Sequence, residues 1–257
     1  MKILAVGDVV GPLGLEYLSK NLRNYISKEH IDLTLVNGEN ASVGNGLCRA
    51  DAEAILEAGA DVITGGNHIW QKKDLRDFLY TRQRIIRPCN YPGQNSGSGY
   101  TIAEARGYRV LVINVMGIVF SEPLDCPFNA VERVLKREEG NYDFAVLDIH
   151  AETTSEKYAL ARYFDGRINC IYGTHTHIPT ADEQILPLGS GYITDIGMTG
   201  AHDGILGVKT ECIIHKLTTK LPTRFELAEN DVRLNGVLFC LNTSTGKVEK
   251  IERVTLS

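Results

Sequence analysis

The 257-residue sequence lacks the marks of several large protein classes. Its six cysteines are scattered and none stands in a C-x-x-C pair, which argues against a disulfide framework or a thiolate zinc site. No apolar run approaches the length of about eighteen residues that a membrane span needs. The formal net charge of −5 argues against a surface built to grip nucleic-acid backbone. We therefore expect a cytoplasmic protein with no membrane contact and no long nucleic-acid partner.

What the sequence does contain is typical of a globular protein. Apolar residues make up 43% and charged residues 23% of the chain, so it can bury a sizeable core. The sequence shows no internal repeat, low-complexity tract or clear linker. We therefore expect one domain over residues 1–257.

Strand-like runs alternate with helical patterns along the first two-thirds of the chain. The expected strands are 2–10, 32–40, 61–68, 143–150 and 169–177, with a hairpin over 100–115. The expected helices are 15–29, 49–60, 70–81, 126–139 and 154–164. Beyond residue 184 the expected elements are strands, mostly antiparallel, at 184–195, 210–219, 223–229, 233–242 and 246–256.

This order of elements predicts an α/β fold. Alternation of strands and helices favours parallel pairing, and the antiparallel tail suggests a second sheet packed against the first. We expect a two-sheet α/β sandwich with mixed sheets and outer helices.

Polar residues that can bind a metal or carry a proton stand at the carboxyl ends of five of the expected strands. They are Asp8, Glu39, Asn40, Asn67, His68, His150, His175 and His177. Ligands of open α/β sheets bind outside the carboxyl ends of parallel strands, so these side chains should meet at one edge. In a strand, His175 and His177 would point to the same side.

Each of these residues also has an ordinary structural interpretation. Asp8 and Asn67 could cap the helices that follow them, and Glu39 and Asn40 could be turn residues. His150 could be a hydrogen-bonded polar residue at a strand end. The 175/177 pair could be polar loop residues, a metal pair, or a base and its partner. Caps alone give no reason for four histidines at one sheet edge, so the set as a whole favours a metal site.

The donor set also indicates which metals to expect. It contains imidazole, carboxylate and amide groups without a thiolate, which suits iron, manganese or zinc. It exceeds the four positions of a tetrahedral zinc and therefore implies two ions. Two-metal sites with ions about 3.5–4 Å apart serve in-line displacement at phosphorus.

The motifs that carry these residues resemble the calcineurin-like metallophosphoesterase superfamily, and within it the YmdB-like bacterial branch of cyclic-nucleotide phosphodiesterases. They are "GDVVG" at 7–11, "NGENA" at 37–41, "GGNHIW" at 65–70, "DIHAE" at 148–152 and "GTHTH" at 173–177, with "DIGMTG" at 195–200 as a further one. Val10 stands where the wider superfamily has a histidine, and Glu39 where it has a bridging aspartate. Both departures agree with the YmdB-like branch.

The resemblance implies a four-layer metallophosphoesterase-like fold and a dinuclear site. One ion would take Asp8, Glu39 and His177, with Asn40 nearby. The other would take Glu39, Asn67, His150 and His175, so that Glu39 bridges. The expected cofactors are two divalent or mixed-valence ions, iron first and manganese or zinc as alternatives.

The implied reaction is hydrolysis of a small 2′,3′-cyclic nucleotide or other phosphodiester by a metal-bridging hydroxide, with His68 as the proton donor. The alternatives are a phosphomonoesterase or nuclease with the same metals, and a regulatory protein that senses metal. A homo-oligomer is compatible with the sequence. The loop 88–98 is a candidate cover for the site, with Tyr91 as a candidate to stack on a base. His202 is expected in a loop and His215 in a strand.

Overall fold

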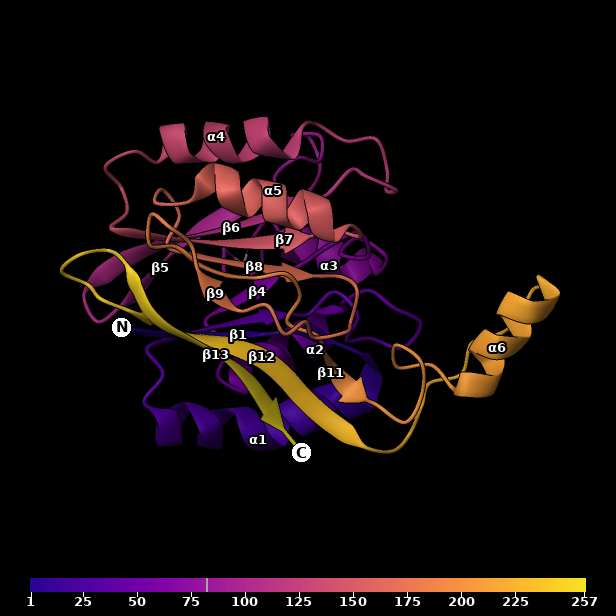
Figure 1. The fold of residues 1–257 in the computed structure, drawn as a ribbon. Helices are drawn as coiled ribbons and strands as arrows, with labels where there is room; N and C mark the ends of the chain where they lie inside the picture. The colour runs from indigo at the N-terminus through magenta and orange to yellow at the C-terminus, as the bar shows by residue number, and fades with distance from the viewer. Residues whose placement is uncertain (82) are drawn as a thin grey trace.

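The computed structural model describes residues 1–81 and 83–257, which build two mixed β-sheets packed face to face with helices outside (Figure 1). Within these residues the first sheet has seven strands, in the order β2-β11-β12-β1-β3-β4 with β13 on the far side of β12. Their bounds are β1 Lys2–Val6, β2 Asp8–Val9, β3 Leu33–Asn37, β4 Val62–Thr64, β11 Met198–Ala201, β12 Val232–Leu241 and β13 Val248–Leu256. Strands β1, β3 and β4 run parallel, and β12 pairs antiparallel to β1.

The second sheet has six described strands, in the order β5-β6-β7-β8-β10-β9. Their bounds are β5 Tyr100–Ala105, β6 Tyr108–Met116, β7 Phe144–His150, β8 Cys170–Thr174, β9 Gln184–Ile185 and β10 Gly191–Ile193. Strands β6, β7, β8 and β10 are parallel to one another, while β5 and β9 form antiparallel edges.

Alternation of side chains along the strands explains the four layers. In β1, Leu4 and Val6 pack into a core beneath the first sheet, with helices α1 (Gly11–Glu29), α2 (Arg49–Glu57) and α3 (Lys73–Phe78). Ile3 and Ala5 point the other way, into a core shared by the two sheets. A third core lies between the second sheet and helices α4 (Pro127–Arg137) and α5 (Thr154–Phe164). The two-sheet sandwich with outer helices is therefore confirmed.

Three details of the expected elements were wrong. Residues 210–219 form helix α6 (Thr210–Thr219) rather than a strand, and 223–229 contribute only an isolated bridge at Leu227. A short β-branched run fits the period of a helix as well as that of a strand. In addition, this segment extends away from the two sheets and has no strand to pair with (Figure 1). The tail does not build the second sheet: β12 and β13 complete the first sheet, and β10 joins the second in parallel.

The third correction concerns the two histidines of the "THTH" stretch. Strand β8 ends at Thr174, so neither histidine lies in a strand. His175 and His177 have φ values of 96° and 65°, in the left-handed region that side chains rarely adopt. Their shared orientation therefore cannot be argued from strand periodicity. Of the part of the chain that the structure describes, no helix combines the length and apolar character needed to cross a membrane.

Candidate metal centre

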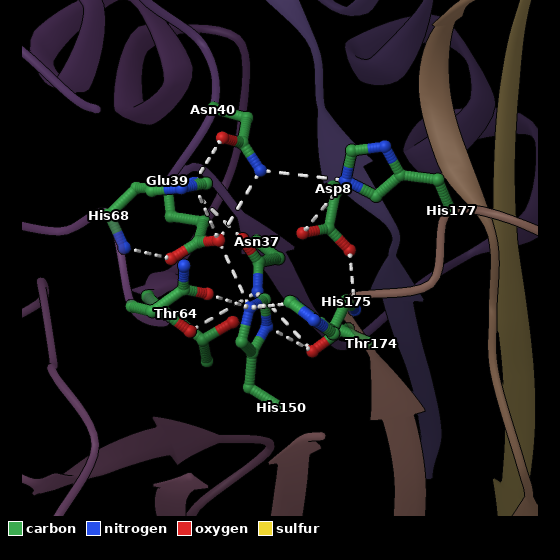
Figure 2. Close-up of polar contacts among 12 residues, drawn as sticks. Asp8, Asn37, Glu39, Asn40, Thr64, His68, His150, Thr174, His175 and His177 are labelled. Carbon is green, nitrogen blue, oxygen red and sulfur yellow. Dashed lines mark hydrogen bonds and ion pairs between the residues drawn. The ribbon is translucent and has the colours of Figure 1, made fainter. Parts of the chain in front are cut away.

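The polar residues expected at the strand ends do meet, at the edge where the carboxyl ends of both sheets face each other (Figure 2). His150 is the last residue of β7, and the 175–177 turn follows β8. Glu39 and Asn40 follow β3, Asn67 and His68 follow β4, and Asp8 begins β2. Asp8, Glu39 and His150 are fully buried.

His150 lies at the middle of one group of donors. Its Nε2 atom is 3.0 Å from Glu39 Oε1, 3.2 Å from Asn67 Oδ1 and 3.1 Å from His175 Nδ1. Its Nδ1 lies 2.9 Å from the Thr174 hydroxyl, which donates to Asp148 Oδ1 at 2.8 Å. Because that hydroxyl proton is committed to Asp148, Nδ1 of a neutral His150 donates to Thr174 and leaves the Nε2 lone pair facing the cluster. This is the tautomer that a metal ligand requires.

The remaining donors form a second group beside the first. His177 Nε2 lies 3.7 Å from Asp8 Oδ1 and 3.5 Å from Asn40 Nδ2. The other Asp8 oxygen accepts from the His175 backbone N–H at 3.2 Å. The two histidines of the turn thus diverge, His175 toward His150 and His177 toward Asp8 (Figure 2).

Burial and mutual charge set the protonation of this cluster. Burial disfavours the charged form of Glu39, but the neighbouring imidazoles of His150 and His68 hold its pKa well below the usual range. Burial likewise opposes protonation of His150, yet Glu39 raises the pKa of His150 to about 9. Burial and His150 together lower the pKa of His175. The buried carboxylates are thus balanced by protonated imidazole, a role that cations would take over on binding.

Four observations show that the donor set fits metal ions. Within residues 1–81 and 83–257, two buried atoms, Asp8 Oδ1 and His177 Nδ1, have no hydrogen-bond partner. Glu39 Oε1, Asn67 Oδ1 and His175 Nδ1 all converge on His150 Nε2, which can hold at most one proton for the three of them. A Cβ atom at Gly66 would lie 2.3 Å from Glu39 Oε2 and 2.4 Å from His150 Nε2, so glycine leaves the space beside these donors open. The ligand atoms of Glu39, His150 and His175 lie within 4.8 Å of one another.

His68 lies next to these donors, with its Nδ1 atom 3.4 Å from Glu39 Oε1. Its Nδ1 is 2.8 Å from Asn40 Oδ1, and its backbone N–H donates to Glu39 Oε2 at 2.9 Å. Asn40 thus turns its oxygen to His68. With Nδ1–H donating to that oxygen, His68 Nε2 remains free, and 26% of the side chain is exposed. The ring is therefore partly open to solvent.

A buried ion pair that the sequence did not reveal supports the strained turn. Lys157 Nζ, on α5, lies 2.6 Å from Asp195 Oδ2, and both side chains are buried. The same oxygen accepts from the backbone N–H and the hydroxyl of Thr176, between the two histidines. Asp195 is part of the "DIGMTG" motif, which could have marked it as a functional residue. No sequence motif marks Lys157. Asp148, behind His150, was also missed.

Replacing Lys157 by methionine should cost about 3–5 kcal/mol in the free energy of unfolding, because it leaves the buried Asp195 carboxylate unpaired. Urea denaturation measures this free energy. The control is Lys20→Met, which removes an exposed pair with Glu16 and should cost at most about 1 kcal/mol. Equal losses in the two variants would contradict a supporting role for the buried pair.

The other singled-out residues lie elsewhere. His202 follows β11 and its Nε2 is 3.1 Å from Asn235 Nδ2, consistent with a loop role. His215 is exposed on α6, so its expected place in a strand was wrong. Tyr91 packs edge-on against Trp70, with ring centroids 4.7 Å apart.

Comparison with solved structures defines the class of fold. A 5′-nucleotidase from Staphylococcus aureus superimposes with a TM-score of 0.59 at 15% identity, over 98% of this chain and 53% of that one. At this identity the likeness concerns the fold alone. A phosphatase from Mycoplasma pneumoniae superimposes with a TM-score of 0.93 at 35% identity, covering 100% of this chain and 93% of that one.

Sequence comparison then defines the family. The model of the YmdB-like proteins matches residues 4–254, and the chain belongs to that family. It is 42% identical over 257 residues to the 2′,3′-cyclic-nucleotide 2′-phosphodiesterase of Bacillus subtilis strain 168, over 100% of this chain and 97% of the relative. The resemblance expected from the motifs is confirmed.

Proposed function

We propose that the chain is a dinuclear metal-dependent phosphodiesterase that hydrolyses small 2′,3′-cyclic nucleotides. The observation that carries the proposal is the convergence of six residues with oxygen or nitrogen ligand atoms in two adjoining groups, which are Asp8, Glu39, Asn67, His150, His175 and His177. Family membership and the name of the Bacillus relative support the reaction class. Iron is the first expectation for the ions, with manganese or zinc as alternatives.

The two donor groups suggest how the ions would be held. Asp8 and His177, with Asn40 nearby, would take one ion, and Asn67, His150 and His175 the other, with Glu39 shared. When bound, the ions would lower the pKa of water to supply a nucleophile near neutral pH and would stabilise charge on the phosphoryl oxygens. Two dications against the carboxylates of Asp8 and Glu39 leave the cavity positive. The neutral Asn67 oxygen does not offset that charge.

His68 would protonate the leaving alkoxide. Its Nδ1–H is held by Asn40 Oδ1 at 2.8 Å, which fixes the ring with Nε2 directed away from the amide. A proton on Nε2 can then pass to the leaving oxygen. Asn40 thereby acts as a positioning residue for His68, a role that its place beside the second donor group, next to His177, also permits.

A substrate panel tests the reaction class. With added manganese or iron, 2′,3′-cAMP should be hydrolysed faster than 3′,5′-cAMP, bis-p-nitrophenyl phosphate or p-nitrophenyl phosphate. Faster turnover of p-nitrophenyl phosphate than of every diester would establish a phosphomonoesterase instead. No hydrolysis by a chain with both ions bound would favour a metal-sensing protein.

The six cysteines are free, which supports a reducing, cytoplasmic compartment.

We infer that a second copy of the chain covers the α6 arm, residues 209–225. None of the α6 residues is buried, and Ile214, Leu217, Leu221 and Phe225 are exposed. A helix of ten residues is marginal without packing. The arm has four basic residues and one acidic residue, net +3, so the rest of the chain carries −5 − 3 = −8. A second copy therefore offers a complementary, acidic surface.

The double variant Leu217→Glu/Leu221→Glu should convert a dimer into a monomer. Light scattering on a sizing column should give twice the 28.4-kDa chain mass for the unaltered protein and the chain mass for the variant. The control, His215→Glu, changes the opposite side of the helix and should keep the dimer. A monomeric unaltered protein would refute the inference.

A further inference from the structure

A second cavity, separate from the metal centre, lies between the loop 88–98, strand β5 and helix α4. Its volume is about 450 Å³, and its lining includes Arg87, Cys89, Tyr91, Tyr100, Arg133 and Arg137. None of the seven proposed metal ligands lines it. The loop that was expected to cover the metal centre therefore forms a wall of a different cavity.

Arg87 is the unusual residue of this cavity. Only 6% of it is exposed, and its Nε atom is buried without a hydrogen-bond partner in the described part of the chain. Its Nη1 donates to the carbonyl of Pro88 at 2.8 Å. Among residues 1–81 and 83–257, no carboxylate lies within ion-pair distance of this guanidinium. A buried cation without a counter-charge is costly, so the Arg87 guanidinium would gain from contact with an anion.

The loop holds Arg87 in this position. The Arg87 backbone N–H donates to the carbonyl of Ser98 at 2.9 Å, which closes the loop across the side chain. Gly97, at a φ of 89°, packs against the Arg87 side chain, and an added Cβ at Gly97 would lie 3.4 Å from Arg87 Cγ. Cys89 cannot act as the counter-charge, because burial raises the pKa of its thiol to about 12 and leaves it neutral near pH 7. The geometry therefore keeps the cation buried and unpaired.

Helix α4 adds two further guanidinium groups at the mouth. Arg133 and Arg137 are one helical turn apart and both line the cavity. Arg133 pairs with the exposed Asp125 at 2.9 Å, the one carboxylate in the lining. The Tyr100 hydroxyl, also in the lining, donates to Glu138 Oε1 at 2.7 Å. Three guanidinium groups against one lining carboxylate leave the cavity positive.

We propose that this cavity binds the phosphate group of a small molecule, either inorganic phosphate or a nucleoside monophosphate. Arg87 is its buried anchor, and Arg133 and Arg137 close the mouth. The planar guanidinium fork matches phosphate oxygens, and that of Arg87 pairs with no carboxylate among the described residues. The volume is enough for a mononucleotide, and the rings of Tyr91 and Tyr100 offer faces for a base. The site is independent of the proposed phosphodiesterase reaction.

Phosphate binding by the metal-loaded protein tests the proposal, with equilibrium dialysis of labelled inorganic phosphate and, in a second arm, of 3′-AMP. Because phosphate can also bind at the metal centre, each measurement is repeated in Glu39→Gln. Arg87→Met and Arg133→Gln/Arg137→Gln should each weaken the Glu39-independent binding by about tenfold or more. The control Lys136→Gln, exposed on the same helix but outside the lining, should bind as the unaltered protein does. Tighter binding of 3′-AMP would identify a nucleotide site, and equal binding a phosphate site.

Thermal unfolding separates a ligand site from a structural role of Arg87. Removing an unpaired buried charge should leave the Tm of phosphate-free protein unchanged or higher in Arg87→Met, while the rise in Tm caused by phosphate disappears. Unchanged phosphate binding in both arginine variants would overturn the proposal. So would the absence of any Glu39-independent binding in the unaltered protein.

Discussion

Glu39→Gln is expected to lower kcat/KM for 2′,3′-cAMP by about a hundred- to a thousandfold, the range typical of removing one electrostatic group from a catalytic site. Both Glu39 oxygens are engaged: Oε1 lies 3.0 Å from His150 Nε2, and Oε2 accepts from the His68 backbone N–H. Glutamine keeps the shape and removes the charge, so the two donor groups lose their shared carboxylate. Metal content should fall in the same variant.

The matched control is Glu57→Gln, an exposed carboxylate on α2 that contacts no donor. It should keep full activity and full metal content, which separates the effect of Glu39 from a general loss of acidic charge. Activity of Glu39→Gln within a few-fold of the unaltered protein would show that Glu39 does not join the two ions.

His68→Ala should reduce turnover of 2′,3′-cAMP by about 10²- to 10⁴-fold while leaving the metal content nearly unchanged. The reason is that His68 contacts Asn40 and offers a free Nε2, whereas the clustered donors are supplied by other residues. Steady-state kinetics and metal analysis of the same preparation measure both quantities. The control is His30→Asn at the exposed C-terminal end of α1. His30 has a left-handed backbone conformation, which asparagine also adopts readily.

The leaving group distinguishes a proton donor from a residue that only shapes the site. A p-nitrophenolate group departs without protonation, so bis-p-nitrophenyl phosphate should lose far less rate than 2′,3′-cAMP in His68→Ala. Equal losses on the two substrates would argue that His68 positions Glu39 or Asn40 instead. Loss of both metals in the variant would likewise reject its assignment as the acid.

The gathering of the site residues could be anticipated from sequence because it depends on topology. Parallel strands bring their carboxyl ends to one edge of a sheet, which anticipates that Glu39 and Asn67 lie together at the edge of the first sheet and that His150 lies beside the turn after β8 at the edge of the second. That these two edges face each other depends on how the sheets pack, which the alternation of elements did not predict. The layers followed from the same alternation. Residues 210–219 were wrongly predicted as a strand because a short apolar run fits the period of a helix as well as that of a strand. Nothing in the local sequence indicates that this segment extends away from the sheets.

The conformation of the site could not be anticipated in the same way. The positive φ values of His175 and His177 depend on long-range contacts, above all the Asp195 carboxylate that binds the turn at Thr176. Asp195 in turn depends on Lys157, which comes from a helix and is fully buried. Likewise, the sequence does not predict that Arg87 is buried, because its burial depends on the loop that closes over it.

The number of metal ions per chain tests the central claim most directly. Elemental analysis of purified, active protein by mass spectrometry, with chain concentration from amino-acid analysis, should give two ions per chain, with iron or manganese predominant. Removal by a chelator should abolish hydrolysis of 2′,3′-cAMP, and return of the ions should restore it. Full activity in protein that holds one ion or none per chain would contradict the dinuclear site.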